Sequence, residues 1–244
     1  MIFGRKIPCG NRNFHRGFCF MNTSDSNFFG TEKVSRILLK IAPPVMLAQL
    51  IQALYNIVDS LFVGKYSESG LTALSIIYPL QLLMIAIAVG TGVGINTAMA
   101  HYLGVHDEKK ANEYGGIGTS LTLALWVLFA AACFFFMPAY ARMSTDSTEV
   151  IKDVIVYGRI VCVFSIGLFT ESIWTKILQA NGDMKTPMIA QIVGALVNIA
   201  LDPLFIFGLF GLPKLGIAGA AIATVVGQIV ACLLYTSDAA DDKA

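Results

Sequence analysis

The stretch ALYNIVDSLFVG, residues 53–64, places one acidic side chain, Asp59, inside an apolar run long enough to cross a membrane. A charged side chain in the middle of such a helix costs about 3 kcal/mol on insertion scales, so it normally faces a bundle interior or a wet cavity. A second copy of the pattern, ALVNIALDPLFIFG at residues 195–208, carries Asp202 in the corresponding position. Two such acids in one apolar chain indicate a shared polar site.

The composition indicates a polytopic membrane protein. Hydrophobic residues make up 56% of the chain and charged residues only 14%, and the mean hydropathy is +0.69. A soluble domain of this size would struggle to cover so much apolar surface. The net charge of +1 argues against nucleic acid as a partner. Five scattered cysteines without a CxxC pair indicate neither a zinc site nor a disulfide framework.

Six apolar stretches predict an all-α fold of six transmembrane helices, because each is at least about as long as the roughly 20 residues that a bilayer core requires. They cover about residues 36–63, 71–103, 116–138, 150–178, 187–209 and 216–234. Pro43 and Pro44 are expected in the first turn of the first helix, where a missing amide costs little. The glycines of GTGVG, residues 90–94, predict the close approach of another helix. The stretch HYLGVHDEKKANEY, residues 101–114, predicts a polar loop with solvated histidines.

Lysines and arginines near the span ends predict a cytoplasmic N-terminus. This orientation places on the inner side Lys33, Arg36, Lys40, Lys109, Lys110, Lys176 and Lys185, and on the outer side Lys65, Arg142, Lys152, Arg159 and Lys214. The first and fifth spans then both run outward. At 1.5 Å per residue, Asp59 lies roughly 28 Å beyond Lys40 and Asp202 roughly 25 Å beyond Lys185. The two carboxylates are therefore expected at one depth, in the outer half of the bilayer.

Polar side chains accompany both acids on the same helix face. Tyr55 stands four residues before Asp59, as Asn198 does before Asp202, and Asn56 stands three residues before Asp59. A desolvated carboxyl beside a like charge and polar donors can exchange a proton or bind a cation. Neutralising the pair would change which helix arrangement is stable, as in a coupling site. The alternative is that Asp202, which precedes a proline, satisfies backbone groups freed at a kink.

These motifs together resemble the N-terminal lobe of the multidrug and toxic compound extrusion (MATE) family, on its bacterial branch. The resemblance covers about residues 35–231 and rests on ALYNIVDSLFVG, IYPLQ, QANGDMKTPM, VNIALDPLFIFG and AGAAIAT. It implies twelve helices in two six-helix lobes with a central cavity. It also implies export of organic cations or drugs across the bacterial plasma membrane in exchange for H+ or Na+, without a further cofactor and without enzymatic activity.

The resemblance implies roles for single residues. Asp59 and Tyr55 match the family's first-helix carboxylate and the tyrosine one turn before it. Asn198 and Asp202 match the fifth-helix pair, and Thr224 matches a sixth-helix hydroxyl that joins them. A coupling Na+ would use Asp59, Asn198, Asp202 and Thr224.

Three residues are candidates for the substrate cavity, namely Gln52, Asn56 and Glu171. If Glu171 lies in the cavity, it would contact a cationic substrate. If it lies near the inner membrane boundary, it would pair with Lys176 or with solvent, and we favour the boundary position.

A lipid-linked saccharide flippase of the same superfamily is the alternative function, but such proteins usually line the cavity with cationic residues, which are almost absent from these spans. An intramembrane enzyme is disfavoured because the spans carry no histidine metal motif or Ser/His pair. A channel would differ from an antiporter in lacking obligatory exchange.

The two ends of the chain depart from the family pattern. Residues 1–20 are basic, and we expect a non-native or disordered extension, with a lipid-facing tail as the alternative. Residues 21–35 are expected to be a cytoplasmic tail before the membrane lobe of residues 36–231. The tail CLLYTSDAADDKA, residues 232–244, resembles a translated sequencing adaptor. We therefore expect native sequence to end near Ala231 and a C-terminal lobe to be missing; a half-size protein that dimerises is the alternative.

Overall fold

The computed structural model of the chain describes residues 34–211 and 213–241, and the expectations for residues 1–20 and for most of residues 21–35 lie outside this part. The described part is all-helical, which confirms the predicted fold class. Its elements are α2 (Val34–Tyr66), α3 (Glu68–Gly104), α4 (Glu108–Ser144), α5 (Thr148–Val163), α6 (Ile166–Ala180), α7 (Lys185–Phe207), the short 3-10 helix η1 (Leu209–Gly211) and α8 (Ile217–Asp241).

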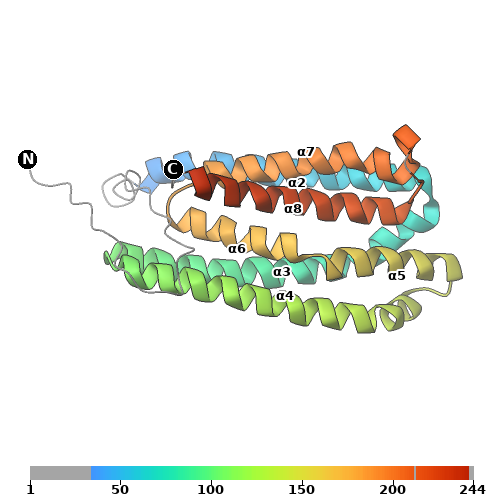
Figure 1. Cartoon of the computed structure of the whole chain (residues 1–244), viewed down its shortest axis with the longest axis horizontal. Coiled ribbons are helices and arrows are strands. Elements are labelled where there is room, and N and C mark those ends of the chain that lie inside the picture. Colours follow the sequence, from blue (N-terminus) through green and yellow to red (C-terminus); the bar gives the residue numbers. More distant parts are fainter. Residues whose placement is uncertain (1–33, 212, 242–244) are drawn as a thin grey trace, which may run out of the picture.

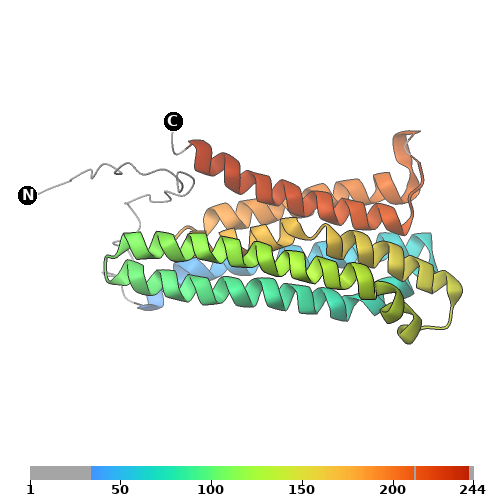
Figure 2. The ribbon, with the colours of Figure 1, turned by 60° about the horizontal axis from the view of Figure 1, so that its bottom comes forward.

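The helices run up and down along one axis of an elongated bundle (Figure 1). Helices α2, α7 and α8 lie together on one side, where α7 packs against both α2 and α8. Helices α3 and α4 pack together on the other side and come to the front when the molecule is turned (Figure 2). Helices α5 and α6 contact both α8 and the α3–α4 pair. Because α2 and α7 run in the same direction, their polar motifs can lie side by side.

The outer surface of the bundle is apolar. By length and composition, five of the described helices could each cross a membrane, and the bent α5–α6 pair could supply a sixth span. Large side chains point outward, among them Phe135 and Leu128, whose exposed fractions are 73% and 69%. Apolar exposure on this scale suits a surface that lipid covers.

The predicted fourth span is not one straight helix. It breaks at Phe164 and Ser165 into α5 and α6, which are bent by 41°. The Ser165 hydroxyl donates a hydrogen bond of 2.7 Å to the carbonyl of Cys162 at the break. Two residues further on, a Cβ added to Gly167 would lie 3.0 Å from the backbone carbonyl carbon of Gln228 in α8. The bend allows this close approach of α6 to α8. The hydropathy pattern of the sequence does not predict this tertiary contact.

The polar loop predicted at residues 101–114 is much shorter than expected. Helix α4 begins at Glu108, directly after Asp107, whose Oδ1 accepts a hydrogen bond of 3.1 Å from the Lys110 amide. This capping bond satisfies an amide that the first turn would leave unpaired, which extends α4 beyond its apolar part. His106, with a φ of 59°, makes the turn between α3 and α4.

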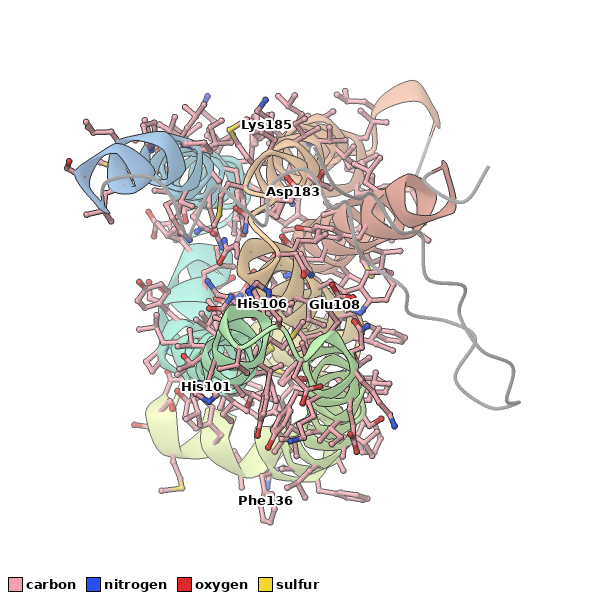
Figure 3. All side chains as sticks on the ribbon, turned by 90° about the vertical axis from the view of Figure 1, so that its left-hand side faces the viewer. His101, His106, Glu108, Phe136, Asp183 and Lys185 are labelled. Carbon is pink, nitrogen blue, oxygen red and sulfur yellow. The ribbon has the colours of Figure 1, made fainter. Side chains whose placement is uncertain are left out.

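The α3–α4 connection and the α6–α7 turn lie at the same end of the bundle. Figure 3 looks onto this end, with His106 and Glu108 at the first connection and Asp183 and Lys185 at the second. The Asp183 carboxylate accepts hydrogen bonds of 2.9 Å from the Lys185 amide and 3.1 Å from the Thr186 amide, where α7 begins. The arrangement agrees with the predicted alternation of spans; the side of the membrane on which this end lies stays a prediction.

Helix α2 begins earlier than the sequence suggested. Pro43 and Pro44 lie inside α2, because the helix starts at Val34 and the apolar span only at Ala42. The expectation that both prolines stand in the first turn of the helix is therefore wrong, although they do stand at the start of its membrane-spanning part.

Only the middle glycine of the GTGVG run allows a close helix contact. A Cβ added to Gly92 would lie 2.8 Å from the Cγ of Lys176 in α6. Gly90 and Gly94 face open space, so the expectation that all of these glycines serve helix packing is wrong for two of them.

Helix α8 continues to Asp241, past its predicted end near residue 234. Tyr235 is 1% exposed, and its hydroxyl lies 2.8 Å from the Thr175 hydroxyl in α6. Residues 242–244 lie outside the described part. The expectations that native sequence ends near Ala231 and that the tail derives from an adaptor stay predictions.

Candidate ion and substrate site

Four of the residues predicted to couple ion movement come from three neighbouring helices and are buried. Asp59 projects from α2, Asn198 and Asp202 from α7, and Thr224 from α8. Their exposed fractions are 6% for Asp59, 3% for Asn198, 0% for Asp202 and 8% for Thr224. The two carboxylates are close enough for the charge of Asp59 to act on Asp202. Both acidic side chains face the interior of the bundle rather than lipid, as the sequence predicted.

A hydrogen bond joins α7 to α8 beside the two acids. The Asn198 Nδ2 donates to the Thr224 Oγ1 at 3.4 Å, and the Thr224 hydroxyl donates to the Ala220 carbonyl at 3.0 Å. The structure thus brings Thr224 to the fifth-helix pair.

Close packing of α7 on α8 makes this hydrogen bond possible. A Cβ added to Gly227 would lie 2.8 Å from the carbonyl oxygen of Gly194 and 3.1 Å from the Cβ of Asn198. A side chain at Gly227 would therefore push the two backbones apart and move Asn198 away from Thr224.

Several oxygens at this site have no hydrogen-bond partner among the described residues. They are the Oδ1 of Asp59, the Oδ1 of Asn198 and both carboxylate oxygens of Asp202. Unpartnered buried oxygens cost free energy, and a proton or a cation would relieve that cost. Carboxylate, amide and hydroxyl oxygens are also the ligands that hard cations prefer, so these side chains fit Na+ as well as H+. The alternative for Asp202, a hydrogen bond to backbone groups freed by Pro203, is not formed.

Two tyrosines flank the acids. The charges of Asp59 and Asp202 reach the hydroxyls of Tyr55 in α2 and of Tyr157 in α5. Tyr157 is 2% exposed, and its hydroxyl accepts a hydrogen bond of 3.5 Å from the Gln81 amide in α3. Tyr55 was expected at the site from its spacing to Asp59, whereas Tyr157 comes from a helix that the sequence did not connect to it.

Two cavities lie on either side of a shared polar wall formed by Gln52, Tyr55 and Gln228. The first, which we call the aspartate cavity, has a volume of about 320 Å³ and is lined by Asp59, Asn56 and Tyr157 among others. The second, which we call the glutamate cavity, has a volume of about 300 Å³.

Glu171 lines the glutamate cavity together with Gln191 of α7. The predicted pairing of Glu171 with Lys176 is therefore wrong, whereas the depth of Glu171 in the membrane stays a prediction. The Lys176 ammonium donates to the Gln179 Oε1 at 3.0 Å instead. The reason is geometric, since a step of five residues turns a side chain about 140° around a helix.

Several polar residues of the cavity walls were not predicted as site residues from the sequence, among them Tyr157, Gln191 and Gln228. Each is a hydrogen-bonding side chain within an apolar run, as in VVGQIVA, residues 225–231. Searching the spans for neutral amides and phenols as well as for charges would have found them.

A bundle of membrane-spanning helices that encloses acids and two polar-walled cavities has the architecture of one lobe of a membrane transporter. The comparisons specify which family. A profile of the MatE family matches residues 44–204 of the chain. The chain belongs to this family, as its motifs predicted.

Curated relatives are about twice as long as this chain. The "Probable multidrug resistance protein YoeA" of Bacillus subtilis is 31% identical over 78% of the chain and 42% of its own length. The "FAD transporter" of Shewanella oneidensis is 28% identical over 82% of the chain and 44% of its own length. The chain therefore spans less than half the length of these relatives, consistent with the N-terminal lobe.

Solved structures show the same fold. A MOP superfamily transporter from Pyrococcus furiosus, whose study is titled "Reverse polarity of binding pocket suggests different function", aligns with a TM-score of 0.81 at 26% identity over 89% of this chain and 47% of that one. An outward-facing multidrug resistance MATE family transporter aligns with a TM-score of 0.76 at 28% identity over 82% of this chain and 44% of that one.

Proposed function

We propose that the chain is one lobe of a secondary antiporter that exports organic cations or drugs across the bacterial plasma membrane in exchange for H+ or Na+. The observation that carries the proposal is the set of buried, unpartnered oxygens on Asp59, Asn198 and Asp202. Such a set has a free-energy reason to bind a small cation and to release it when the surroundings change.

The proposed coupling acts through charge. When both carboxylates are ionised they repel each other, which opposes close packing of α2 on α7. A proton or Na+ that binds between them removes the repulsion and favours the packed arrangement. Asn198 and Thr224 would supply neutral oxygens for the ion, and Tyr55 would supply a hydroxyl between the ion and the cavities. In full-length relatives this change would occur beside the second lobe.

The name of the Bacillus subtilis relative and the charge of the cavities support a drug exporter over a lipid-linked saccharide flippase. The described residues that line the two cavities include a single basic side chain, Lys176. A cavity that binds the anionic head group of a lipid-linked saccharide would need more positive charge.

Exchange across a proteoliposome membrane tests the proposed function. The full-length protein in which this chain occurs is reconstituted with ethidium as the transported cation. An imposed gradient of H+ in sodium-free medium, or of Na+ without a pH difference, should drive ethidium accumulation. The gradient that works identifies the coupling ion.

Two outcomes contradict the proposal. Equal ethidium flux with and without either gradient would indicate a channel, and gradient-driven uptake of an anionic cargo with no movement of ethidium would exclude organic cations as substrates. Liposomes without protein, and protein with both gradients collapsed by ionophores, are the controls.

A further inference from the structure

Glu171 lies on an interior wall built by several helices. It projects from α6 into the glutamate cavity, where it faces Gln52 and Tyr55 of α2, Gln191 of α7 and Gln228 of α8. The Gln191 amide interacts with the Glu171 carboxylate, and the charge of Glu171 reaches the Tyr55 hydroxyl. The carboxylate is thus surrounded by neutral polar groups.

No basic side chain pairs with Glu171 in the described part of the chain. The candidate is Lys176, which lines the same cavity, but its ammonium bonds to Gln179 and its stem packs against Gly92. A smaller recess of about 40 Å³, which Glu171 also lines, has only neutral side chains besides Glu171 among its described lining residues. A carboxylate inside an apolar bundle without a positive partner provides a binding site for a cation that enters from the cavity.

This position is separate from the pair of aspartates. Gln52 stands seven residues before Asp59 on α2, and Gln191 stands seven residues before Asn198 on α7. Seven residues correspond to roughly 10 Å along a helix. Gln52 and Gln191, which surround Glu171, therefore stand about two turns from Asp59 and Asn198 along their helices. The recess of about 40 Å³ is lined by Glu171 as well as by Asn198 and Thr224, so the two positions are distinct but adjoin each other.

We propose that Glu171 binds the cationic group of the cargo, at a site separate from the ion site of Asp59 and Asp202. The inference rests on the proposed function and assigns the residue that selects cations. The size of the cavity favours an organic cation over an inorganic ion, because about 300 Å³ lies at the lower end of the range for small-molecule sites. Its wall also presents Ile85, Val89, Leu168 and Met188, which would pack against the apolar body of such a cargo.

Tyr55 connects the two sites. It lines both cavities, and the charges of Glu171, Asp59 and Asp202 all act on its hydroxyl. A cation at Glu171 and an ion at the aspartates therefore share one polar neighbour, so the charge state of one site acts on the other.

Binding of three probes of similar shape tests the role of Glu171. Tetraphenylphosphonium is cationic, triphenylphosphine oxide is neutral and tetraphenylborate is anionic. Their affinities are measured on the full-length protein in nanodiscs, without an ion gradient, for the wild type and for Glu171→Gln. We expect the substitution to weaken tetraphenylphosphonium binding about tenfold or more and to leave triphenylphosphine oxide within about twofold, because a charge is removed and the shape is kept.

Lys176→Gln is the matched control. It alters the charge of the same wall in the opposite sense, so it should tighten tetraphenylphosphonium binding. Glu113→Gln, on the exposed surface of α4, should have no effect. Equal loss of the cationic and neutral probes in Glu171→Gln would indicate damage to the cavity and would overturn the proposal, as would a wild-type preference for tetraphenylborate.

A further result would assign Glu171 to the exchanged ion instead. If Glu171→Gln keeps its affinity for tetraphenylphosphonium but loses the response to the ion gradient in the ethidium assay, the carboxylate does not bind cargo and the proposal is overturned. Failure of the proposed function looks different. Ethidium flux through the wild type would then be equal with and without either gradient, while the binding differences at Glu171, measured without a gradient, would still be present.

Discussion

Asp59 and Asp202 have different surroundings although they occupy matching positions in two similar motifs. Asp202 is fully buried, and neither of its oxygens has a partner in the described structure. Asp59 lines the aspartate cavity and is the member of the pair that a cation can reach from there. We therefore infer that an ion enters past Asp59 and that Asp202 completes its binding.

Asp202→Asn should abolish gradient-driven drug export and leave membrane insertion intact. The amide has the same shape but cannot change charge at the pH of the cell. Because the substitution removes an unpaired buried charge, the thermal midpoint should be unchanged or raised. Drug resistance of cells that express the full-length protein measures the export. Asp146→Asn, in the exposed α4–α5 connection, is the control.

Asp59→Asn should have the same effect. If the two carboxylates act as one unit, the double variant should be no worse than either single variant. Undiminished resistance in Asp202→Asn would remove Asp202 from the mechanism, and additive losses would separate the two acids into independent sites.

At the scale of elements, the contact between α7 and α8 sets the geometry of the ion site. Gly194 and Gly227 let the two backbones approach so closely that Asn198 reaches Thr224. Helix association within a membrane depends on such small residues, because lipid provides no hydrophobic driving force between helices. The same residue type has no such role at Gly90, where no heavy atom lies within 4 Å of an added Cβ.

Gly227→Ala and Gly90→Ala should therefore change stability in opposite directions. An alanine normally stabilises a helix by about 0.5–1 kcal/mol relative to glycine, which is the expectation for Gly90→Ala. At Gly227 the new methyl group would meet the Gly194 carbonyl, and overpacking should cost about 1–3 kcal/mol. Thermal unfolding in detergent measures both. Equal shifts in the two variants would show that the α7–α8 contact is not tight.

At the scale of the whole molecule, the alternating helices place the α3–α4 connection and the α6–α7 turn at one end and the α4–α5 connection at the other. The first end carries Lys109, Lys110 and Lys185. Positive charge near the ends of spans favours the cytoplasmic side, so we predict that this end is cytoplasmic.

Cysteine labelling in a background without native cysteines tests this orientation. Ser147→Cys, at the exposed start of α5, should react with a membrane-impermeant maleimide in intact cells. Lys109→Cys, in the first turn of α4, should react only after the membrane is permeabilised. The reverse pattern would place this end of the bundle outside and contradict the predicted orientation.

Much of this protein follows from local patterns in its sequence. Long apolar runs predicted the membrane helices, because each must satisfy its own backbone hydrogen bonds in lipid. The i and i+4 spacing placed Tyr55 and Asp59, and likewise Asn198 and Asp202, on one helix face. The break at Phe164 and the true start of α4 were missed, since a close helix contact and a capping carboxylate decide them rather than hydropathy.

The sequence by itself determined the family, the alternation of spans and the positions of the two buried acids, because each depends on residue type and spacing along one helix. Only the tertiary structure decided which helices share a wall. It brought Tyr157 close to the aspartates and placed Glu171 on the wall of a cavity that four other helices also line. These contacts depend on how helices pack against one another, and the periodicity of a single helix does not indicate which other helix packs against it.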